Sequence, residues 1–133
     1  MKRDALPELL LIERKVEALF VTMAETDRPL RGTAGRADWR LGGILSQWIK
    51  SGQLTGREDE CVYVPIDVVP PLHIIVVGVG AARKRSAGSL KLAARVAKNL
   101  KLKSIAFSEA DFGEPSDDVI TKSFAGIEVC VTP

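Results

Sequence analysis

Aromatic residues, histidine and cysteine are all scarce in this sequence. Aromatic residues make up 5% of the 133 residues, so valine, isoleucine, leucine and alanine must fill most of any core. One histidine, His73, and two separated cysteines, Cys61 and Cys130, supply no zinc or iron ligand set without carboxylates. No Gly-x-Ser-x-Gly segment marks a nucleophilic serine. These absences argue against most metalloenzymes and cysteine nucleophiles, and we expect no catalytic residue, metal or cofactor.

Long apolar runs are also missing. None approaches the roughly 20 residues of a membrane span, and no secretory leader pattern follows Met1. Cys61 and Cys130 each stand in a valine-rich stretch. We therefore expect both to be buried thiols of a cytoplasmic protein. The length and the 46% hydrophobic content suit one domain, residues 1–133, without a membrane partner.

Acidic residues are absent between Asp67 and Glu109. That stretch carries eight basic residues: Arg83, Lys84, Arg85, Lys91, Arg95, Lys98, Lys101 and Lys103. Residues 109–128 then carry six acidic residues and one lysine. The net charge of +2 therefore hides a basic segment beside an acidic one.

Strand and helix patterns alternate along the chain. Apolar or β-branched runs predict strands, and periodic apolar stripes or capping signals predict helices. The expected strands are 8–14, 17–24, 61–67, 72–79 and 103–107, and the expected helices are 37–50, 86–100 and one that begins near 114. The first two strands are too close for a crossover, so a hairpin or a bulged pair is expected there. Residues 127–131 are either the end of the last helix or an edge strand. This order indicates an α/β domain with a mixed sheet and a central strand, 72–79, buried on both faces.

The turn after the most apolar strand is the first candidate site. Gly78 and Gly80 would let a ligand approach the backbone, and Ser86 would cap the next helix. The charges of Arg83, Lys84 and Arg85 would attract an anion to this helix start. The segment lacks the third glycine of a dinucleotide fingerprint and the Gly-Lys-Ser/Thr of a P-loop. A tight turn with solvated charges is the alternative.

A basic helix face is the second candidate. Lys84, Lys91, Arg95 and Lys98 recur at spacings of seven, four and three, which places them in one stripe. Such a stripe binds nucleic acid or an acidic partner, but it is also typical of a solvated helix face. No aromatic residue for base stacking occurs in this segment.

Two glycines and the histidine complete the candidates. Gly42 and Gly43 fall inside the expected helix 37–50, where each costs about 1 kcal/mol relative to alanine. A compensating close approach, of another backbone or of a ligand phosphate, is therefore expected at both. His73 opens strand 72–79, where we expect a half-buried imidazole hydrogen-bonded to backbone rather than a catalytic base.

Segments in the middle of the chain resemble the N-terminal domain of the leucyl (cytosol) aminopeptidases. The matching segments are Glu17-Ala-Leu-Phe-Val-Thr, Leu41-Gly-Gly through Gly56, Cys61-Val-Tyr-Val-Pro, Leu72 through Lys84, and Lys103-Ser-Ile-Ala-Phe107. The resemblance implies a three-layer α/β/α fold similar to macro domains, with a mixed central sheet. These aminopeptidases keep two metals and a catalytic lysine in a separate C-terminal domain. No residue here matches that domain's motifs, so no catalytic residue carries over.

The resemblance also suggests what the chain does. Because the family's N-terminal domain contributes to hexamer assembly, it implies a non-catalytic module that binds its own copies or a protein partner. A nucleotide, phosphate or nucleic-acid ligand at the basic turn and helix is one alternative. Macro domains bind ADP-ribose through an asparagine-rich loop and a Gly-Gly-Gly-Val loop. Here Gly42-Gly43-Ile44 partly matches the second, while the only asparagine is Asn99. The other alternative is a fragment of a metal-dependent leucyl aminopeptidase.

Overall fold

The computed structural model describes residues 2–3, 6–67, 72–81 and 87–133. Within these residues, six strands form one sheet in the order β1-β6-β5-β2-β4-β3. Neighbouring strands are parallel except β3 and β4, which are antiparallel. The strands are β1 (Lys2–Arg3), β2 (Ala18–Met23), β3 (Cys61–Ile66), β4 (Leu72–Gly78), β5 (Ser104–Ser108) and β6 (Glu128–Thr132).

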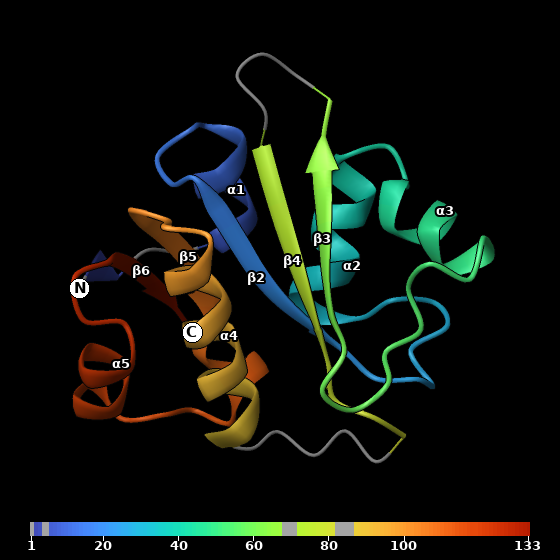
Figure 1. Cartoon of the computed structure of the whole chain (residues 1–133). Coiled ribbons are helices and arrows are strands. Elements are labelled where there is room, and N and C mark those ends of the chain that lie inside the picture. Colours follow the sequence, from blue (N-terminus) through green and yellow to red (C-terminus); the bar gives the residue numbers. More distant parts are fainter. Residues whose placement is uncertain (1, 4–5, 68–71, 82–86) are drawn as a thin grey trace.

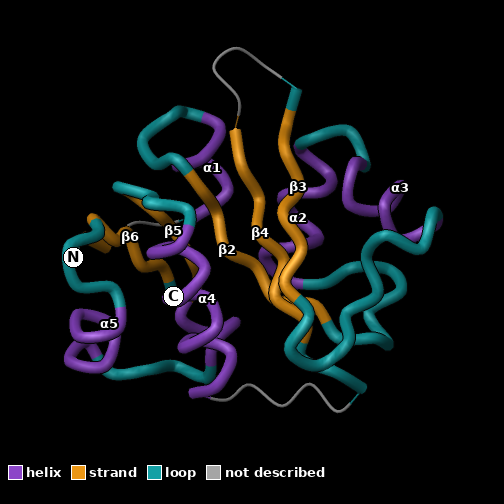
Figure 2. Tube along the Cα trace, viewed as in Figure 1, coloured by secondary structure: helices purple, strands orange, loops and turns teal. Residues whose placement is uncertain are grey.

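Helices cover both faces of this sheet (Figures 1 and 2). One face packs against α1 (Pro7–Ile12), α2 (Gly32–Arg40) and α3 (Ile44–Lys50). The other packs against α4 (Ala87–Asn99), the 3-10 helix η1 (Glu109–Phe112) and α5 (Asp117–Ser123). The three-layer α/β/α fold with a mixed sheet is therefore confirmed.

The core has two halves because strand side chains alternate between the faces. In β2, Leu19 and Val21 join the α1–α3 side, while Ala18 and Phe20 join the α4–α5 side. β4 lies inside the sheet with helices on both faces, so its β-branched residues are buried in both directions, as predicted.

The strand predicted over 8–14 is wrong. Residues 7–12 form α1, with Pro7 in its first turn and Leu10 and Leu11 in the core. Leucine favours helix at least as much as strand, and proline is well placed where a helix begins, so this short apolar run was ambiguous. The predicted hairpin is wrong as well, because β2 pairs in parallel with β4 and β5.

The single helix predicted over 37–50 is also wrong. α2 ends at Arg40 and α3 begins at Ile44, and Gly42 and Gly43 between them have φ values of 74° and 82°. Among the described residues, no atom apart from those of its chain neighbours lies within 4 Å of a Cβ built on either glycine, so the predicted close packing is not seen there. The glycines supply the left-handed backbone of a turn. Asp38 closes that turn, since its Oδ1 accepts hydrogen bonds from the amide of Leu45 at 2.8 Å and from that of Ser46 at 3.2 Å.

The remaining elements follow the predictions closely. The strands expected at 17–24, 61–67, 72–79 and 103–107 are β2, β3, β4 and β5, and the helix expected at 86–100 is α4. α5 begins after Ser116, whose hydroxyl accepts a hydrogen bond from the amide of Val119 at 3.3 Å. Residues 128–132 form strand β6, which is not an edge strand because β1 lies beyond it.

Candidate binding surface

The two glycines of the turn after β4 are occupied by contacts within the chain. A Cβ on Gly78 would lie 1.9 Å from the carbonyl oxygen of Arg57. The amide of Gly78 donates to the carbonyl of Glu60 at 2.7 Å, and that of Gly80 donates to the carbonyl of Gly56 at 2.9 Å. Residues of the 56–60 loop therefore make the close approach that Gly78 and Gly80 permit, and the approach of a ligand to this turn stays a prediction.

The rest of that predicted anion site consists of four residues. Arg83, Lys84, Arg85 and Ser86 lie outside the described residues. Binding of an anion there stays a prediction, and it now depends on these side chains rather than on the amides of the two glycines.

Glu60 fixes the loop that packs on β4. Its carboxylate accepts hydrogen bonds from the amide of Thr55 at 3.2 Å, from the amide of Arg57 at 3.0 Å and from the Thr55 hydroxyl. Burial by itself raises the pKa of Glu60, but these hydrogen bonds together outweigh it and hold the pKa below its ordinary value. The carboxylate therefore stabilises the conformation of residues 55–60 through these hydrogen bonds.

The basic face of α4 is exposed in the structure. Lys91, Arg95 and Lys98 point to solvent, while Leu90 and Ala94 are buried against the sheet. Lys84, the first member of the predicted stripe, lies outside the described residues. The exposed face is compatible with nucleic acid or an acidic partner, and that binding stays a prediction.

His73 and the cysteines lie on or beside the strands. His73 is half-buried, and its Nδ1 shares a hydrogen bond with the hydroxyl of Tyr63 rather than with the predicted backbone group. Neither cysteine forms a disulfide; Cys130 is buried as predicted and Cys61 is half-buried. Burial raises the pKa of the Cys61 thiol, although the charge of Arg95 works against it.

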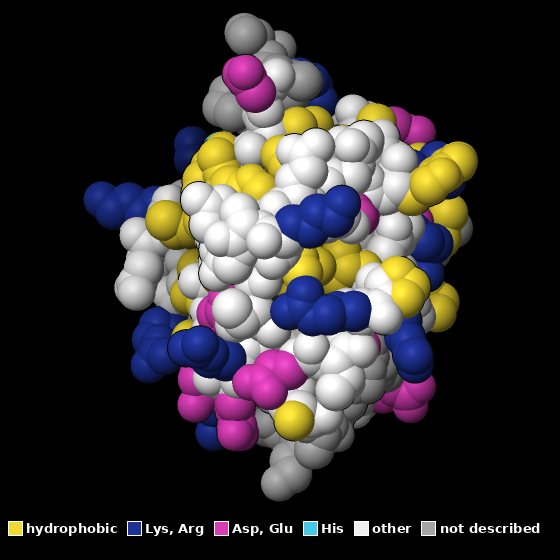
Figure 3. All heavy atoms as spheres, turned by 90° about the vertical axis from the view of Figure 1, so that its right-hand side faces the viewer, with side chains coloured by type: hydrophobic (Ala, Val, Ile, Leu, Met, Phe, Trp, Pro, Cys, Tyr) yellow, Lys and Arg dark blue, Asp and Glu magenta, His cyan; other side chains and the backbone are white. Residues whose placement is uncertain are grey.

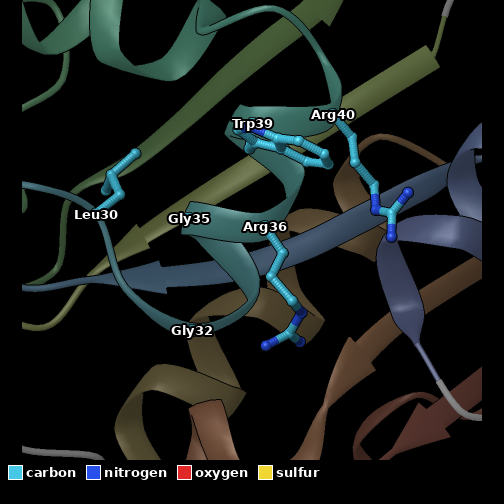
Figure 4. Close-up of a pocket in the computed structure, with 6 residues that line it drawn as sticks. All are labelled: Leu30, Gly32, Gly35, Arg36, Trp39 and Arg40. Atoms are coloured by element: carbon cyan, nitrogen blue, oxygen red, sulfur yellow. The ribbon is translucent and has the colours of Figure 1, made fainter.

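A further surface feature lies on α2, and the sequence-based predictions do not include it. Among the large apolar side chains of the described residues, Trp39 is the most exposed, at 80%. It borders a hollow of about 440 Å³, shown in Figure 4. We call this the α2 hollow; it is lined by Leu30, Gly32, Gly35, Arg36, Trp39 and Arg40.

Local packing shapes the α2 hollow. A Cβ on Gly35 would lie 2.7 Å from the carbonyl oxygen of Leu30, so glycine permits the preceding segment to run close to α2. Arg36 donates from Nε to Oε1 of Glu8 at 2.8 Å, and Glu8 is only 1% exposed. The guanidinium of Arg40 lies 5.9 Å from the centroid of the Trp39 ring, within cation–π range. In Figure 4 the three side chains of Arg36, Trp39 and Arg40 project from the outer side of α2.

The segment of the chain that contains the α2 hollow is rich in basic residues. Residues 28–57 carry six basic residues and one acid, Asp38. Asp38 is buried and bound to the first amides of α3, so it does not offset the surface charge. The exposed members are Arg28, Arg31, Arg36, Arg40, Lys50 and Arg57. The signal was present in the sequence: Trp39 stands off the apolar stripe of Leu41, Ile44, Leu45 and Trp48, next to an arginine.

A second, smaller hollow of about 220 Å³ adjoins the first and shares Leu30 with it. Its other lining residues are Asp27, Arg28, Pro29, Ser46, Ile49 and Lys50. Figure 3 views the side of the molecule that carries α3, where lysine and arginine side chains stand among exposed hydrophobic ones. The second hollow therefore borders a face on which apolar, basic and acidic side chains are mixed.

The part of the chain that the structure describes has neither a membrane-spanning helix nor a cluster of metal ligands. None of its helices is long and apolar enough to cross a membrane. Nor do any three or more of its histidine, cysteine, aspartate and glutamate side chains gather where they could hold a metal ion.

Residues 18–128 match the family model of the cytosol aminopeptidase family, N-terminal domain. The chain belongs to this family. A leucine aminopeptidase variant from tomato is 16% identical with a TM-score of 0.62; the match covers 98% of this chain and 31% of the tomato chain. No curated protein sequence matches the chain significantly.

Solved macrodomains share the fold. The macrodomain of Thermus aquaticus DarG is 16% identical with a TM-score of 0.69, over 99% of this chain and 97% of that one. Thermosipho africanus DarTG in complex with ADP-ribose is 12% identical with a TM-score of 0.63, over 92% and 39%. These identities show a common fold alone, and they confirm the macro-domain-like architecture that the resemblance implied.

Proposed function

We propose that this chain is a non-catalytic assembly and interaction module of the aminopeptidase family, and that it docks a protein partner on the α2 hollow. One observation supports the proposal above the others: Trp39 is 80% exposed between two arginines of the same helix. Tryptophan and arginine are the residues that most often dominate the energy of protein interfaces. A tryptophan with so little burial contributes little to its own fold, so a partner that covers it gains most of its apolar surface.

The arginines suit the same role. Arg36 is held by the buried carboxylate of Glu8, so it loses less freedom when a partner binds. Its side chain still remains 45% exposed and available to a second acceptor. Arg40 stacks near Trp39, which combines a charge and an aromatic face at one point. The α2 hollow is therefore suited to an apolar side chain with acidic neighbours.

A nucleotide or nucleic-acid ligand on α4 is the second candidate function. It is supported by the exposure of Lys91, Arg95 and Lys98 and by the ADP-ribose complex of one structural relative. Titration with ADP-ribose and with duplex DNA at low and physiological salt tests it. DNA binding that falls steeply with salt, and that is lost when the three side chains become alanine, is the expected result. Absence of binding to both probes rejects it.

Peptidase activity is a proposal about residues outside this chain. The chain spans 31% of the tomato aminopeptidase, and its described residues hold no metal cluster. We therefore expect the purified chain with added zinc or manganese to release no leucine from a chromogenic amide. Separately, we propose that the protein is located in the cytoplasm. Metal-dependent release by this chain, unchanged after repeated purification, would revive the alternative of a metal-dependent leucyl aminopeptidase.

Photo-crosslinking in cells tests the docking proposal directly. Trp39 is replaced by a photo-reactive aromatic amino acid, which keeps an aromatic group in the α2 hollow. The matched control places the same group at Leu100, an exposed apolar residue directly after α4. We expect discrete crosslinked protein adducts from position 39 and few from position 100. Equal incorporation with no protein adduct at position 39 would contradict the proposal.

A further inference from the structure

We infer that the outer edge of β3 binds an extended segment of another protein, in which acidic and apolar residues alternate, as one more antiparallel strand of the sheet. We define the β3 edge as the backbone groups of Cys61, Tyr63 and Pro65 that point away from β4. The β3 edge shares no residue with the α2 hollow, so the inference goes beyond the proposed function and does not depend on it.

The pairing of β3 decides which of its backbone groups point outward. Among the described residues, β3 ends the sheet and pairs with β4 alone. In an antiparallel pair, the backbone groups of successive residues point alternately toward the partner strand and away from it. The carbonyl of Glu60 points toward β4, because it accepts a hydrogen bond from the amide of Gly78 at 2.7 Å. By that alternation Cys61, Tyr63 and Pro65 point away from β4.

The β3 edge offers hydrogen-bonding groups that the sheet does not use. Outside the ladder with β4, no hydrogen bond in the described part of the chain reaches the amide or carbonyl of Cys61 or Tyr63. Each of the two can therefore exchange a pair of hydrogen bonds with an added antiparallel strand. Pro65 has a carbonyl but no N–H, so the pairing weakens beyond Tyr63. The Tyr63 side chain is 41% exposed and Pro65 is exposed as well.

The face of the sheet that α4 covers brings positive charge to this edge. Cys61 packs against the core on that face, so residues of an added strand opposite Cys61 and Tyr63 would point there too. Burial raises the pKa of the Cys61 thiol, and the charge of the exposed Arg95 opposes this, which places the guanidinium near the edge. Lys91 and Lys98 continue the exposed stripe of Arg95 along α4. An acidic side chain is the complement of this face.

The other face of the sheet is apolar beside the same edge. Val62 and Val64, which alternate with the outward residues, pack against the core on the α3 side. Ile44, Trp48 and Ile49 of α3 are only partly buried against that core. In Figure 1, α3 lies beyond β3, outside the edge of the sheet, and Figure 3 shows hydrophobic side chains on that side of the molecule. An added strand would therefore lie along α3 and bury apolar surface.

The two faces together define the occupant. Successive residues of a strand point to opposite faces, so a segment that alternates acidic and apolar residues suits both faces at once. β3 itself contains no acidic residue, so the same strand of a second copy would not supply the charge. Nucleic acid would meet the charge of Arg95, but it lacks the alternating N–H and C=O groups of an extended peptide.

Synthetic peptides measure the interaction with the purified chain. The test peptide alternates glutamate and valine. One control has lysine in place of glutamate, and another has the glutamates and valines in separate blocks. We expect the alternating acidic peptide to bind at least about tenfold more tightly than either control, as measured by isothermal titration calorimetry.

Backbone methylation of the peptide tests the added strand without changing the protein. In the antiparallel arrangement the glutamates face α4 with their side chains and β3 with their amides, so N-methylation of the glutamates removes the donors to β3. We expect that change to weaken binding by about tenfold or more. N-methylation of the valines is the matched control, and it should cost much less because those amides point away from β3.

Two variants of the chain test the same contact from its other side. Tyr63→Pro removes the outward N–H and no hydrogen bond to β4, while Tyr63→Ala keeps the N–H and loses the side chain. Arg95→Glu reverses the charge beside Cys61, and Lys122→Glu on α5, where the side chain is 79% exposed, is its control. Tyr63→Pro and Arg95→Glu should weaken binding by about tenfold, and their controls by less than about threefold. Circular dichroism verifies that each variant is folded.

Four results would overturn the inference. The first is an alternating acidic peptide that does not bind, and the second is equal binding of the separate-block peptide. The third is binding that neither methylated glutamates nor Tyr63→Pro weakens, since charge alone would then explain it. The fourth is loss of peptide binding in Trp39→Ala, which would place the peptide on the α2 hollow. The first three results leave the proposed function standing, because none of them involves that hollow.

Discussion

The Nε atom of Arg36 donates a hydrogen bond to Oε1 of Glu8 at 2.8 Å and thereby joins α2 to α1. The pair is asymmetric, since the glutamate is 1% exposed and the arginine side chain is 45% exposed. A buried carboxylate with a charged partner depends on that partner, because an unpaired charge is costly in the core. The bond therefore ties a surface arginine of the α2 hollow to the interior of the domain.

Removing the anchor should affect both stability and docking. Glu8→Ala leaves Arg36 without its acceptor, and we expect it to lower the free energy of unfolding by about 2 kcal/mol. Glu8→Gln keeps an acceptor oxygen and should cost less. Urea denaturation monitored by circular dichroism measures both. A Glu8→Ala variant as stable as wild type would show that the pair contributes nothing.

The two groups of glycines should respond differently to alanine. At Gly78 a Cβ would meet the carbonyl oxygen of Arg57 at 1.9 Å, so Gly78→Ala must displace the 56–60 loop. We expect a loss of about 3 kcal/mol. At Gly43 the space is open and the cost is the left-handed backbone alone, about 1–2 kcal/mol. Chemical denaturation of both variants compares them; a larger loss at Gly43 would contradict the packing described for the turn after β4.

Trp39 should be dispensable for folding, whereas Leu45, a core residue of α3, should not be. Trp39 is 80% exposed, so Trp39→Ala should change the free energy of unfolding by less than about 0.5 kcal/mol. Leu45 on α3 is fully buried, and Leu45→Ala should cost about 3 kcal/mol. Thermal melts of dilute protein make the comparison. A large loss from Trp39→Ala would mean that the tryptophan serves the fold rather than a partner.

Acid should reduce the contribution that Glu60 makes to the stability of the 55–60 loop. The pKa of Glu60 is lower in the folded protein than in the unfolded chain. Its contribution to stability is therefore present above the unfolded pKa and is lost as the pH falls through the folded pKa. Stability of wild type and Glu60→Gln as a function of pH tests this. The variant should show a weaker pH dependence in the acid range; identical curves would reject the role of Glu60.

The sequence predicts best where residue type alone decides the conformation. The β-branched run that becomes β4 has no competing helical pattern, and its burial on both faces follows from its composition. The leucine-rich stretch before Arg14 carries no such preference, so only its packing shows that it is a helix. The cost of glycine inside a helix predicts close packing at Gly42 and Gly43, whereas two successive glycines more simply end a helix, as they do here.

The candidate site was harder to predict because it depends on contacts across the chain. That Gly78 packs against residue 57 is not visible in either segment alone. The exposure of Trp39 could be inferred once α2 is seen as a separate helix, since tryptophan stands outside its buried residues Ala34 and Ala37. The ion pair between Arg36 and Glu8 depends on α1, and the sequence predicts a strand in its place.

Tryptophan emission tests the central claim most directly, namely that a protein partner, a further copy of the chain included, covers the α2 hollow. The Trp48→Phe variant leaves Trp39 as the sole tryptophan, because the chain has two. The account predicts that its emission shifts to shorter wavelength, and that acrylamide quenches it less, as the protein concentration rises and as salt falls. Emission and quenching that stay those of an exposed indole at every concentration, in protein shown to be folded and associated, would contradict it.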